Sequence, residues 1–319
     1  MRNRPIDILC VGELLIDIIT KDFVETIDEA DTFKRLPGGS PANLGMNMQR
    51  LGNNVRLVST IGRDDMGNFL RRFVQNLGLE TTSLRQIATP TTLILVTRSR
   101  EVSNFEAYRG ADCRISESQL SDDLLQKTSV FHTTCFALSK KPAQKTILNA
   151  AKRAVALGVR LSIDVNYAQK IWQNQAEAQR IVAEYCRHGA FVKCSEVDWE
   201  RLMGSPLTDA QAAVRHFIKL GAGEVCVTLG GDGCWIGSNT EGVHFLPTRP
   251  VDVKDTTGAG DAFWSGYLTA RLDGHSILNA AKAGRRMAEL KLGHFGPLPA
   301  KVEKETIYED IKQAKLINA

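Results

Sequence analysis

Short apolar runs rich in β-branched residues alternate along this chain with longer amphipathic stretches. The alternation is typical of an α/β fold with a mostly parallel sheet, because a crossover helix returns the chain to the same edge of the sheet after each strand. It predicts strands at Ile6–Val11, Val55–Ile61, Val130–Thr133, Val159–Ile163, Phe191–Val192 and Glu224–Thr228. It predicts helices at Pro41–Leu51, Met66–Leu77, Ala143–Leu157, Ala176–Arg187, Asp209–Leu220, Asp261–Leu272 and Ser276–Lys291.

Two segments interrupt this alternation, Asp17–Arg35 and Thr91–Tyr108. Polar and apolar residues alternate there over short lengths, which predicts extra strands with one apolar face. These strands form either a small sheet over the main body or a pair of ordinary surface hairpins. The sequence shows no internal repeat and no linker, so residues 1–319 are expected to form a single domain.

Composition and charge add only broad limits. Of 319 residues, 43% are hydrophobic and 24% charged, which is enough for one large domain with a sizeable core. The net charge of +4 comes from scattered lysines and arginines, so nucleic acid is not an expected partner. No apolar run approaches the roughly 20 residues that cross a membrane, no signal peptide precedes the first strand, and the seven cysteines contain no C-x-x-C pair. We therefore expect a cytoplasmic protein with reduced thiols and no membrane partner.

The run Asp255–Phe263 combines glycines, a carboxylate and the start of an apolar helix. Backbone N–H groups at a helix start have no helical partners, so Gly258, Ala259 and Gly260 form a candidate anion site for a transferring phosphate. Asp261 follows directly, and a carboxylate there is placed to accept a proton from an attacking hydroxyl. The alternative is that these residues only cap an ordinary helix, since Asp is favourable in a first turn.

A second polar stretch, 37–45, leads into an apolar helix with Asn43 in its opening turn. Gly38 and Gly39 allow close backbone approach to a polar ligand, and Asp17 ends another short motif, Gly12–Asp17. In order and spacing, and over nearly the whole chain, these segments resemble the ribokinase-like carbohydrate kinases, also called the PfkB family. The supporting motifs are Ile61–Gly67, Asp164–Asn166 and Val227–Gly233.

The resemblance implies a ribokinase-like fold in which segments 17–35 and 91–109 form a small β lid over a sugar. It implies ATP-dependent, magnesium-assisted phosphorylation of a sugar hydroxymethyl group, with Asp261 as the base and Gly258, Ala259 and Gly260 as the anion hole. The sugar-binding residues that it implies are Asp17, Gly38, Gly39, Asn43, Asn166 and Arg109, whose guanidinium fork suits phosphate or sugar oxygens. Taken alone, Asp17 and Arg109 also fit solvent-exposed residues at strand ends.

The prediction of nucleotide-binding residues depends mainly on the resemblance, because the chain has neither a P-loop motif nor a dinucleotide fingerprint after its first strand. The implied nucleotide contacts are Lys193, Ser195, Asp198, Thr228, Gly230 and Gly233. Ser195 and Asp198 stand where the family usually has Asn and Glu. Either Asp198 acts near magnesium through a water molecule, or Ser195 is simply the N-cap of a helix. The glycine-rich stretch also fits a hairpin turn. The family often binds a monovalent cation, K⁺, which would place Asp255 and Thr257 as oxygen donors with further ligands from Leu292–Pro297.

The sequence narrows the choice of sugar that accepts the phosphoryl group but does not determine it. Fructose is the leading acceptor, with 2-keto-3-deoxygluconate and 5-dehydro-2-deoxygluconate as competitors, and a nucleoside is disfavoured. Many kinases of fructose or ketodeoxygluconate have Arg where this chain has Ala168, and Lys170 nearby cannot reproduce an Arg fork. A regulator that binds sugar or nucleotide without turnover is the alternative of another class, which Asp261 beside an intact anion hole argues against. A homodimer formed through the lid is also expected.

Overall fold

The computed structural model describes residues 4–98 and 104–312, and a nine-stranded sheet forms its centre. The strand order is β13-β12-β11-β10-β9-β8-β1-β4-β5. Neighbours from β11 to β5 are parallel, whereas β12 and β13 continue the sheet in antiparallel pairs. The strands are β1 (Ile6–Val11), β4 (Val55–Gly62), β5 (Leu84–Ile87), β8 (Thr128–Thr134), β9 (Arg160–Asp164), β10 (Phe191–Ser195), β11 (Glu224–Thr228), β12 (Cys234–Ser238) and β13 (Gly242–Leu246).

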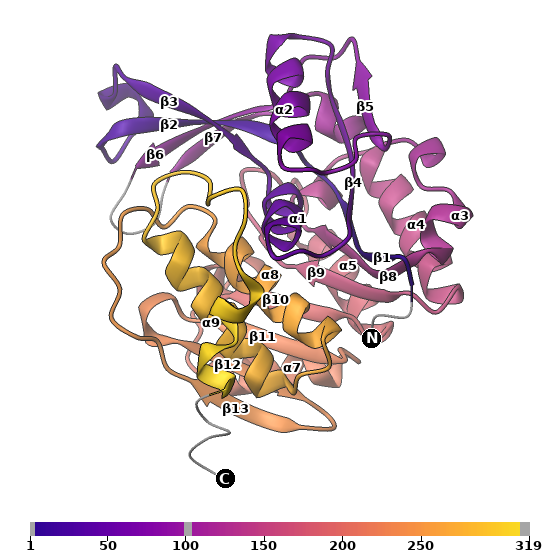
Figure 1. Cartoon of the computed structure of the whole chain (residues 1–319), viewed down its shortest axis with the longest axis vertical. Coiled ribbons are helices and arrows are strands. Elements are labelled where there is room, and N and C mark those ends of the chain that lie inside the picture. Colours follow the sequence, from indigo (N-terminus) through magenta and orange to yellow (C-terminus); the bar gives the residue numbers. More distant parts are fainter. Residues whose placement is uncertain (1–3, 99–103, 313–319) are drawn as a thin grey trace.

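Helices cover both faces of this sheet, and each face has its own core. Alternate residues of β1 show the division, since Leu9 and Val11 pack in one core while Ile8 and Cys10 pack in the other. The first core includes residues of α3 (Asp122–Gln126), α4 (Ala143–Ala156), α5 (Gln175–Arg187), α6 (Glu196–Met203) and α7 (Ala210–Lys219). The second includes residues of α1 (Ser40–Arg50), α2 (Asp65–Asn76), α8 (Ala259–Leu272), α9 (Ile277–Leu292) and α10 (Lys304–Ile307). Helices α1, α8 and α9 pack side by side (Figure 1).

All strands and helices predicted from the alternating pattern are present, with ends that differ by a few residues. The prediction missed β5, β12, β13, α3, α6 and α10. These elements are short, and tertiary pairing or packing forms them more than any periodic pattern does. The sheet therefore extends beyond the predicted parallel part at both edges.

The two interrupting segments form a second sheet of four strands in the order β3-β2-β6-β7. It consists of β2 (Leu15–Phe23), β3 (Phe33–Gly38), β6 (Leu93–Arg98) and β7 (Phe105–Tyr108), and residues 99–103 of the predicted segment lie outside the described residues. β2 pairs in parallel with β6, so the segments form one small sheet and not two separate hairpins. This sheet projects from the edge of the main body (Figure 1).

Helices α8 and α9 cross at very close range because two glycines face each other there. A Cβ atom at Gly266 would lie 2.7 Å from the Ala283 carbonyl oxygen and 2.9 Å from Met287 Cβ. A Cβ atom at Gly284 would lie 2.7 Å from the Phe263 carbonyl oxygen. The crossing fixes α8, whose first turn carries Asp261, against the body of the protein.

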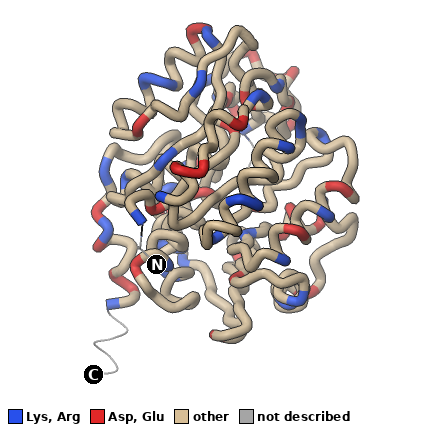
Figure 2. Tube along the Cα trace, turned by 90° about the vertical axis from the view of Figure 1, so that its right-hand side faces the viewer, with Lys and Arg blue, Asp and Glu red and all other residues tan. Residues whose placement is uncertain are grey.

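Positions of Lys and Arg are interspersed with positions of Asp and Glu along the trace in the view of Figure 2. Within residues 4–98 and 104–312, no helix is both long enough and apolar enough to span a membrane.

We predict that Gly266→Ala destabilises the protein by about 1–3 kcal/mol, because the added methyl group overlaps the backbone of α9 and outweighs the better helix propensity of Ala. Chemical denaturation of both proteins measures this difference. Gly231→Ala is the matched control, since no atom lies within 4 Å of its Cβ position. An unchanged free energy of unfolding for Gly266→Ala would show that the helices can move apart at no cost.

Candidate active site

The residues with candidate chemistry lie at the carboxyl ends of the parallel strands. There the loop after β1 contacts the first turn of α1 through Glu13, and Lys193 of β10 lies against Gly260 in the first turn of α8. In open α/β sheets this edge is where ligands bind, because successive loops open there. A pocket lined by Asp17, Asn43, Asp255, Gly258 and Lys291 lies at this edge.

Asp261 stands in the first turn of α8, directly after the glycine run. Gly258 is the N-cap of this helix and has φ +76°, a left-handed conformation that favours glycine. Ser40 Oγ donates a hydrogen bond to Asp261 Oδ1 at 2.6 Å, and Asn43 Nδ2 donates to Oδ2 at 3.0 Å. The first turn of α1 thus holds both oxygens of the carboxylate. The carboxylate lies beside N–H groups that have no partner within α8, and one of them, the Ala259 N–H, donates to the Thr256 carbonyl oxygen at 3.2 Å.

The predicted glycine pair lies between Asp17 and Glu13. The Asp17 carboxylate fills the space that a side chain at position 38 would need. A Cβ atom on Gly38 would lie only 2.0 Å from Asp17 Oδ2. Gly39 has φ +104°, and a Cβ atom on it would lie 2.3 Å from the Glu13 carbonyl oxygen. These glycines therefore bring β2, β3 and α1 together, and any other residue would displace Asp17.

The acidic groups influence one another. Burial and the negative charges of Asp261 and Asp255 raise the pKa of Asp17 to about 7. Burial also raises the pKa of Asp261, although the hydrogen bonds from Ser40 and Asn43 and the charge of Lys193 oppose this shift. A carboxylate with a raised pKa is the stronger base once it is deprotonated.

Lys193 supplies a buried positive charge beneath the start of α8. Its Nζ lies 2.8 Å and 3.0 Å from the two carboxylate oxygens of Asp164, at the end of β9. Burial acts to lower the pKa of Lys193, but Asp164, Asp198 and Asp261 together raise it, so the ammonium stays charged. A Cβ atom at Gly260 would lie 3.1 Å from this Nζ, which places the cation directly against the predicted anion hole.

The remaining nucleotide-side residues lie in two turns at the same edge. Thr228 ends β11, and Gly230 (φ +54°) and Gly233 (φ +109°) shape the turn into β12, which is also the hairpin turn that the sequence allowed. Ser195 caps α6, and the Asp198 carboxylate accepts bonds from the Ser195 and Tyr167 N–H groups. Both oxygens of Asp198 thus already accept hydrogen bonds inside the protein.

Asn166 lies in the loop after β9, and its φ of +26° is the only positive value among the non-glycine residues that the structure describes. Ala168, next in this loop, is 9% exposed and packs in the core with Tyr167 and Trp172. Position 168 therefore presents no charged group to a ligand.

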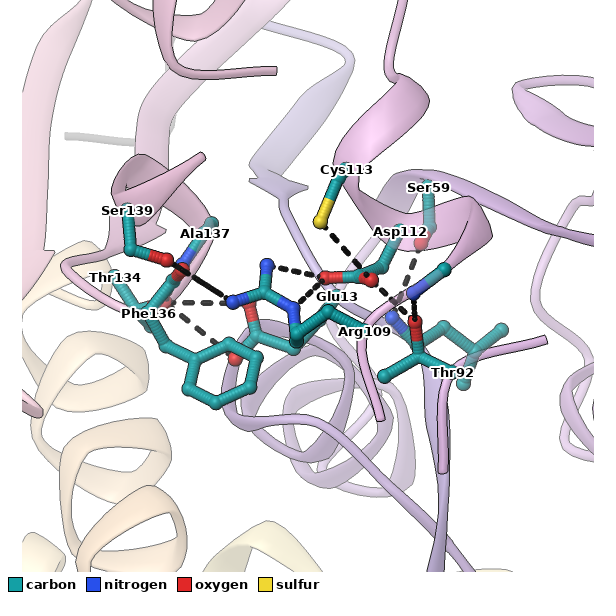
Figure 3. Close-up of polar contacts among 12 residues, drawn as sticks. Glu13, Ser59, Thr92, Arg109, Asp112, Cys113, Thr134, Phe136, Ala137 and Ser139 are labelled. Carbon is teal, nitrogen blue, oxygen red and sulfur yellow. Dashed lines mark hydrogen bonds and ion pairs between the residues drawn. The ribbon is translucent and has the colours of Figure 1, made fainter. Parts of the chain in front are cut away.

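Arg109 differs from the sequence-based expectation of a fork directed at a ligand. Its Nε donates to Asp112 Oδ2 at 2.8 Å, and its Nη1 donates to Ser139 Oγ at 3.0 Å (Figure 3). The guanidinium also lies 4.0 Å from the centre of the Phe136 ring, and the side chain is only 2% exposed. Because a buried guanidinium needs a close counter-charge, Asp112 pairs with it, and Arg109 holds the end of β7 against the main body.

Asp255 and Thr257, the predicted oxygen ligands of a monovalent cation, are close together, but a lysine contacts Asp255. Asp255 Oδ1 accepts a bond from the Thr257 N–H at 3.0 Å, while Asp255 Oδ2 lies 3.2 Å from Lys291 Nζ. Burial acts to raise the pKa of Asp255, but hydrogen bonds from Thr257 and Gly296 and the positive charge of Lys291 outweigh it and lower this pKa.

Sequence reasoning did not identify Ser40, Glu13 or Lys291 at this site. Ser40 precedes Pro41 at the start of a helix, a position that signals only capping. Glu13 accepts a bond from the Ser40 N–H, and burial raises its pKa to about 8. Lys291 lies in the last turn of α9, where basic residues are common for reasons of helix stability alone.

We predict that the free energy of unfolding of Asp17→Asn increases relative to that of wild type as the pH rises from 4.5 to 7.5. The native Asp17 carboxyl holds its proton up to a pH of about 7, whereas the unfolded chain releases it near 3.8. The wild-type protein therefore loses stability relative to the variant over this window, by at least about 1 kcal/mol at its upper end. Thermal or urea unfolding at several pH values measures the difference.

Asp28→Asn, which removes an exposed carboxylate outside the pocket, is the control for that series. Equal stability of Asp17→Asn and wild type at every pH would contradict the raised pKa of Asp17.

Comparison with known proteins gives a family. A model described as pfkB family carbohydrate kinase matches residues 5–304. The ATP-dependent 6-phosphofructokinase of Thermoanaerobacterium thermosaccharolyticum is 32% identical over 305 residues, covering 96% of this chain and 94% of that protein. Halothermothrix orenii fructokinase superposes with a TM-score of 0.76 at 29% identity, covering 91% of this chain and 99% of that one.

A putative ribokinase II from E. coli, solved with ATP and Mg²⁺, superposes with a TM-score of 0.84 at 21% identity and covers 97% of this chain and 99% of its own. This likeness confirms the ribokinase-like fold. The fold, the matched family model and the full-length relatives agree, and the chain belongs to the pfkB family of carbohydrate kinases.

Proposed function

We propose that this carbohydrate kinase transfers the γ-phosphoryl group of ATP to a hydroxymethyl group of fructose. The observation that carries the proposal is the Asp261 carboxylate, which Ser40 and Asn43 hold at the first turn of α8. The similarity to a fructokinase supports the acceptor, and the similarity to an ATP-dependent kinase supports the donor.

In this mechanism Asp261 accepts the proton of the sugar hydroxyl as the hydroxyl oxygen attacks the γ-phosphorus. A new P–O bond forms while the bond to the leaving ADP oxygen breaks, so one proton moves to Asp261 and the phosphoryl group moves to the sugar. The N–H groups of Gly258, Ala259 and Gly260, with the Lys193 ammonium beneath them, stabilise negative charge on the transferring oxygens.

Sugar hydroxyls would be held by Asp17, Asn43 and Asn166 and by the backbone at Gly38 and Gly39. The four-stranded sheet would cover the sugar as a lid and exclude water, which protects ATP from hydrolysis. The side chains of Phe23 and Tyr108 on this sheet are 51% and 62% exposed, which supports a homodimer formed through the lid. Segments 17–35 and 91–109 are thus lid parts of one kinase domain, 1–319.

On the nucleotide side, the turn with Thr228, Gly230 and Gly233 would contact phosphates. The position of a Cβ atom at Gly230 has no neighbour within 4 Å, so the backbone there is open to a ligand. Asp198 would hold a magnesium ion through a water molecule, and the Ser195 N–H, 3.1 Å from Asp198 Oδ2, fixes that carboxylate. The ion would neutralise negative charge on the phosphates. Lys193 completes the positive side of the site.

A phosphorylated acceptor, fructose 6-phosphate, is a second candidate. Arg50 lines the same pocket as Asp17 and Asn43 and is 4% exposed. Its Nη2 atom is buried and has no hydrogen-bond partner among residues 4–98 and 104–312. Its Nε donates to the Pro299 carbonyl oxygen at 3.0 Å and its Nη1 to Asn47 Oδ1 at 3.1 Å, so only the Nη2 group of this buried guanidinium is left to bind an anionic group. One full-length relative is named a 6-phosphofructokinase. The acidic ketodeoxy sugars gain no support from Ala168, which is buried and uncharged.

We expect Asp261→Asn to lower kcat by about 10²- to 10⁴-fold while the fold and ATP binding are kept, because the variant cannot accept the proton. Single-turnover kinetics at saturating substrates and calorimetric ATP binding measure the two quantities. Asp123→Asn, at an exposed site, is the charge-matched control. Near-wild-type turnover would remove Asp261 from the proposed mechanism.

Coupled measurement of ADP release across a panel of acceptors decides the substrate. We expect kcat/KM for fructose to exceed that for ribose, adenosine and 2-keto-3-deoxygluconate by about tenfold or more. Fructose 6-phosphate belongs in the same panel. If it is the better acceptor and Arg50→Met removes that preference, the second candidate replaces the first.

A further inference from the structure

Lys291 places a buried ammonium group beside the start of α8, and neither the proton transfer nor the anion hole described above uses it. The side chain leaves the last turn of α9 and is 8% exposed. Its Nζ lies 3.2 Å from Asp255 Oδ2 and 3.2 Å from the His294 carbonyl oxygen. The ammonium therefore has a carboxylate and a backbone carbonyl as its acceptors.

These acceptors belong to two loops that the ammonium joins. The Lys254 N–H donates to the Leu292 carbonyl at 2.8 Å, and the Gly296 N–H donates to Asp255 Oδ2 at 3.3 Å. The other oxygen of Asp255 receives the Thr257 N–H at 3.0 Å. The loop before α8 is thus held to the loop after α9 around one positive charge.

The same charge is close to the proposed anion hole. A Cβ atom at Gly258 would lie 3.8 Å from Lys291 Cε and equally 3.8 Å from Asp261 Oδ2. Lys291 is also one of the groups that act against the raised pKa of Asp261. The ammonium therefore affects the backbone that starts α8 and the field at the base.

A monovalent cation at Asp255 and Thr257 would compete with this ammonium. Such a cation requires the carboxylate and carbonyl oxygens of these loops, and Lys291 already bonds to Asp255 Oδ2 and to the His294 carbonyl. A second positive charge held by the same oxygens would be repelled by the ammonium, because the two like charges would lie close together in a site that is largely shielded from water. The residues present do not fit a K⁺ ion in addition to the lysine.

We propose that the Lys291 ammonium supplies the positive charge that a monovalent cation would otherwise supply, so that the kinase works without K⁺. Lys291 is then a positioning residue, which acts through Asp255 and the Thr257–Gly258 backbone on the anion hole. This inference rests on the proposed phosphoryl transfer at Asp261.

The test compares wild type with Lys291→Met in choline chloride, NaCl, KCl and NH₄Cl at equal ionic strength. We expect wild-type turnover to vary by less than about twofold among these salts, since its cation is covalently attached. Lys291→Met should lose about tenfold or more in choline chloride and regain most of that loss in KCl or NH₄Cl, because these ions can enter the space of the ammonium. Activation of wild type by K⁺, or a variant that no salt restores, would overturn the proposal.

A thermal readout separates this inference from the proposed function, because it requires no turnover. KCl should raise the midpoint of unfolding of Lys291→Met relative to choline chloride and leave wild type unchanged. Lys127→Met, which removes an exposed lysine paired with Asp123, is the matched control and should respond like wild type. If Lys291→Met does not fold in choline chloride, recovery of folded protein on refolding in KCl supports the proposal, and equal failure in both salts contradicts it.

Discussion

The crowding of carboxylates around the first turn of α8 is the constraint on which the rest of this structure depends. Asp17 and Asp255 lie close enough to Asp261 for their charges to act on one another, and Asp164 lies on the far side of Lys193. Such a cluster is stable only if hydrogen-bond donors and cations are placed among the acids. Lys193 and Lys291 provide the cations, and Ser40 and Asn43 provide the donors.

These groups come from parts of the chain that are far apart, so the architecture has to bring them together at short range. Glycines do this wherever two backbones meet. Gly39 admits the Glu13 backbone beside α1, and Gly266 and Gly284 let α8 lie directly on α9. Since α8 carries Asp261 and α9 carries Lys291, the close crossing of these helices fixes the distance between the proposed base and the second cation.

The small sheet is connected to the same cluster through the loop after α9. Lys34 Nζ lies 4.2 Å from the centre of the Phe295 ring, and the guanidinium of Arg98 lies 5.1 Å from it. The adjacent Gly296 donates to Asp255. A continuous set of contacts therefore runs from the strands of the small sheet to the carboxylate that precedes α8.

The sequence by itself determined the architecture and the centre of the site. Periodic patterns gave every long strand and helix, and the run Asp255–Phe263 located the candidate base and anion hole, because these features depend on local spacing. Only the tertiary structure decided which groups meet across the chain. It paired Arg109 with Asp112, directed Asn43 and Ser40 to Asp261, and placed the Lys291 ammonium on Asp255. A side chain chooses its partner by burial and by the charges around it, and both exist only once distant segments have packed together.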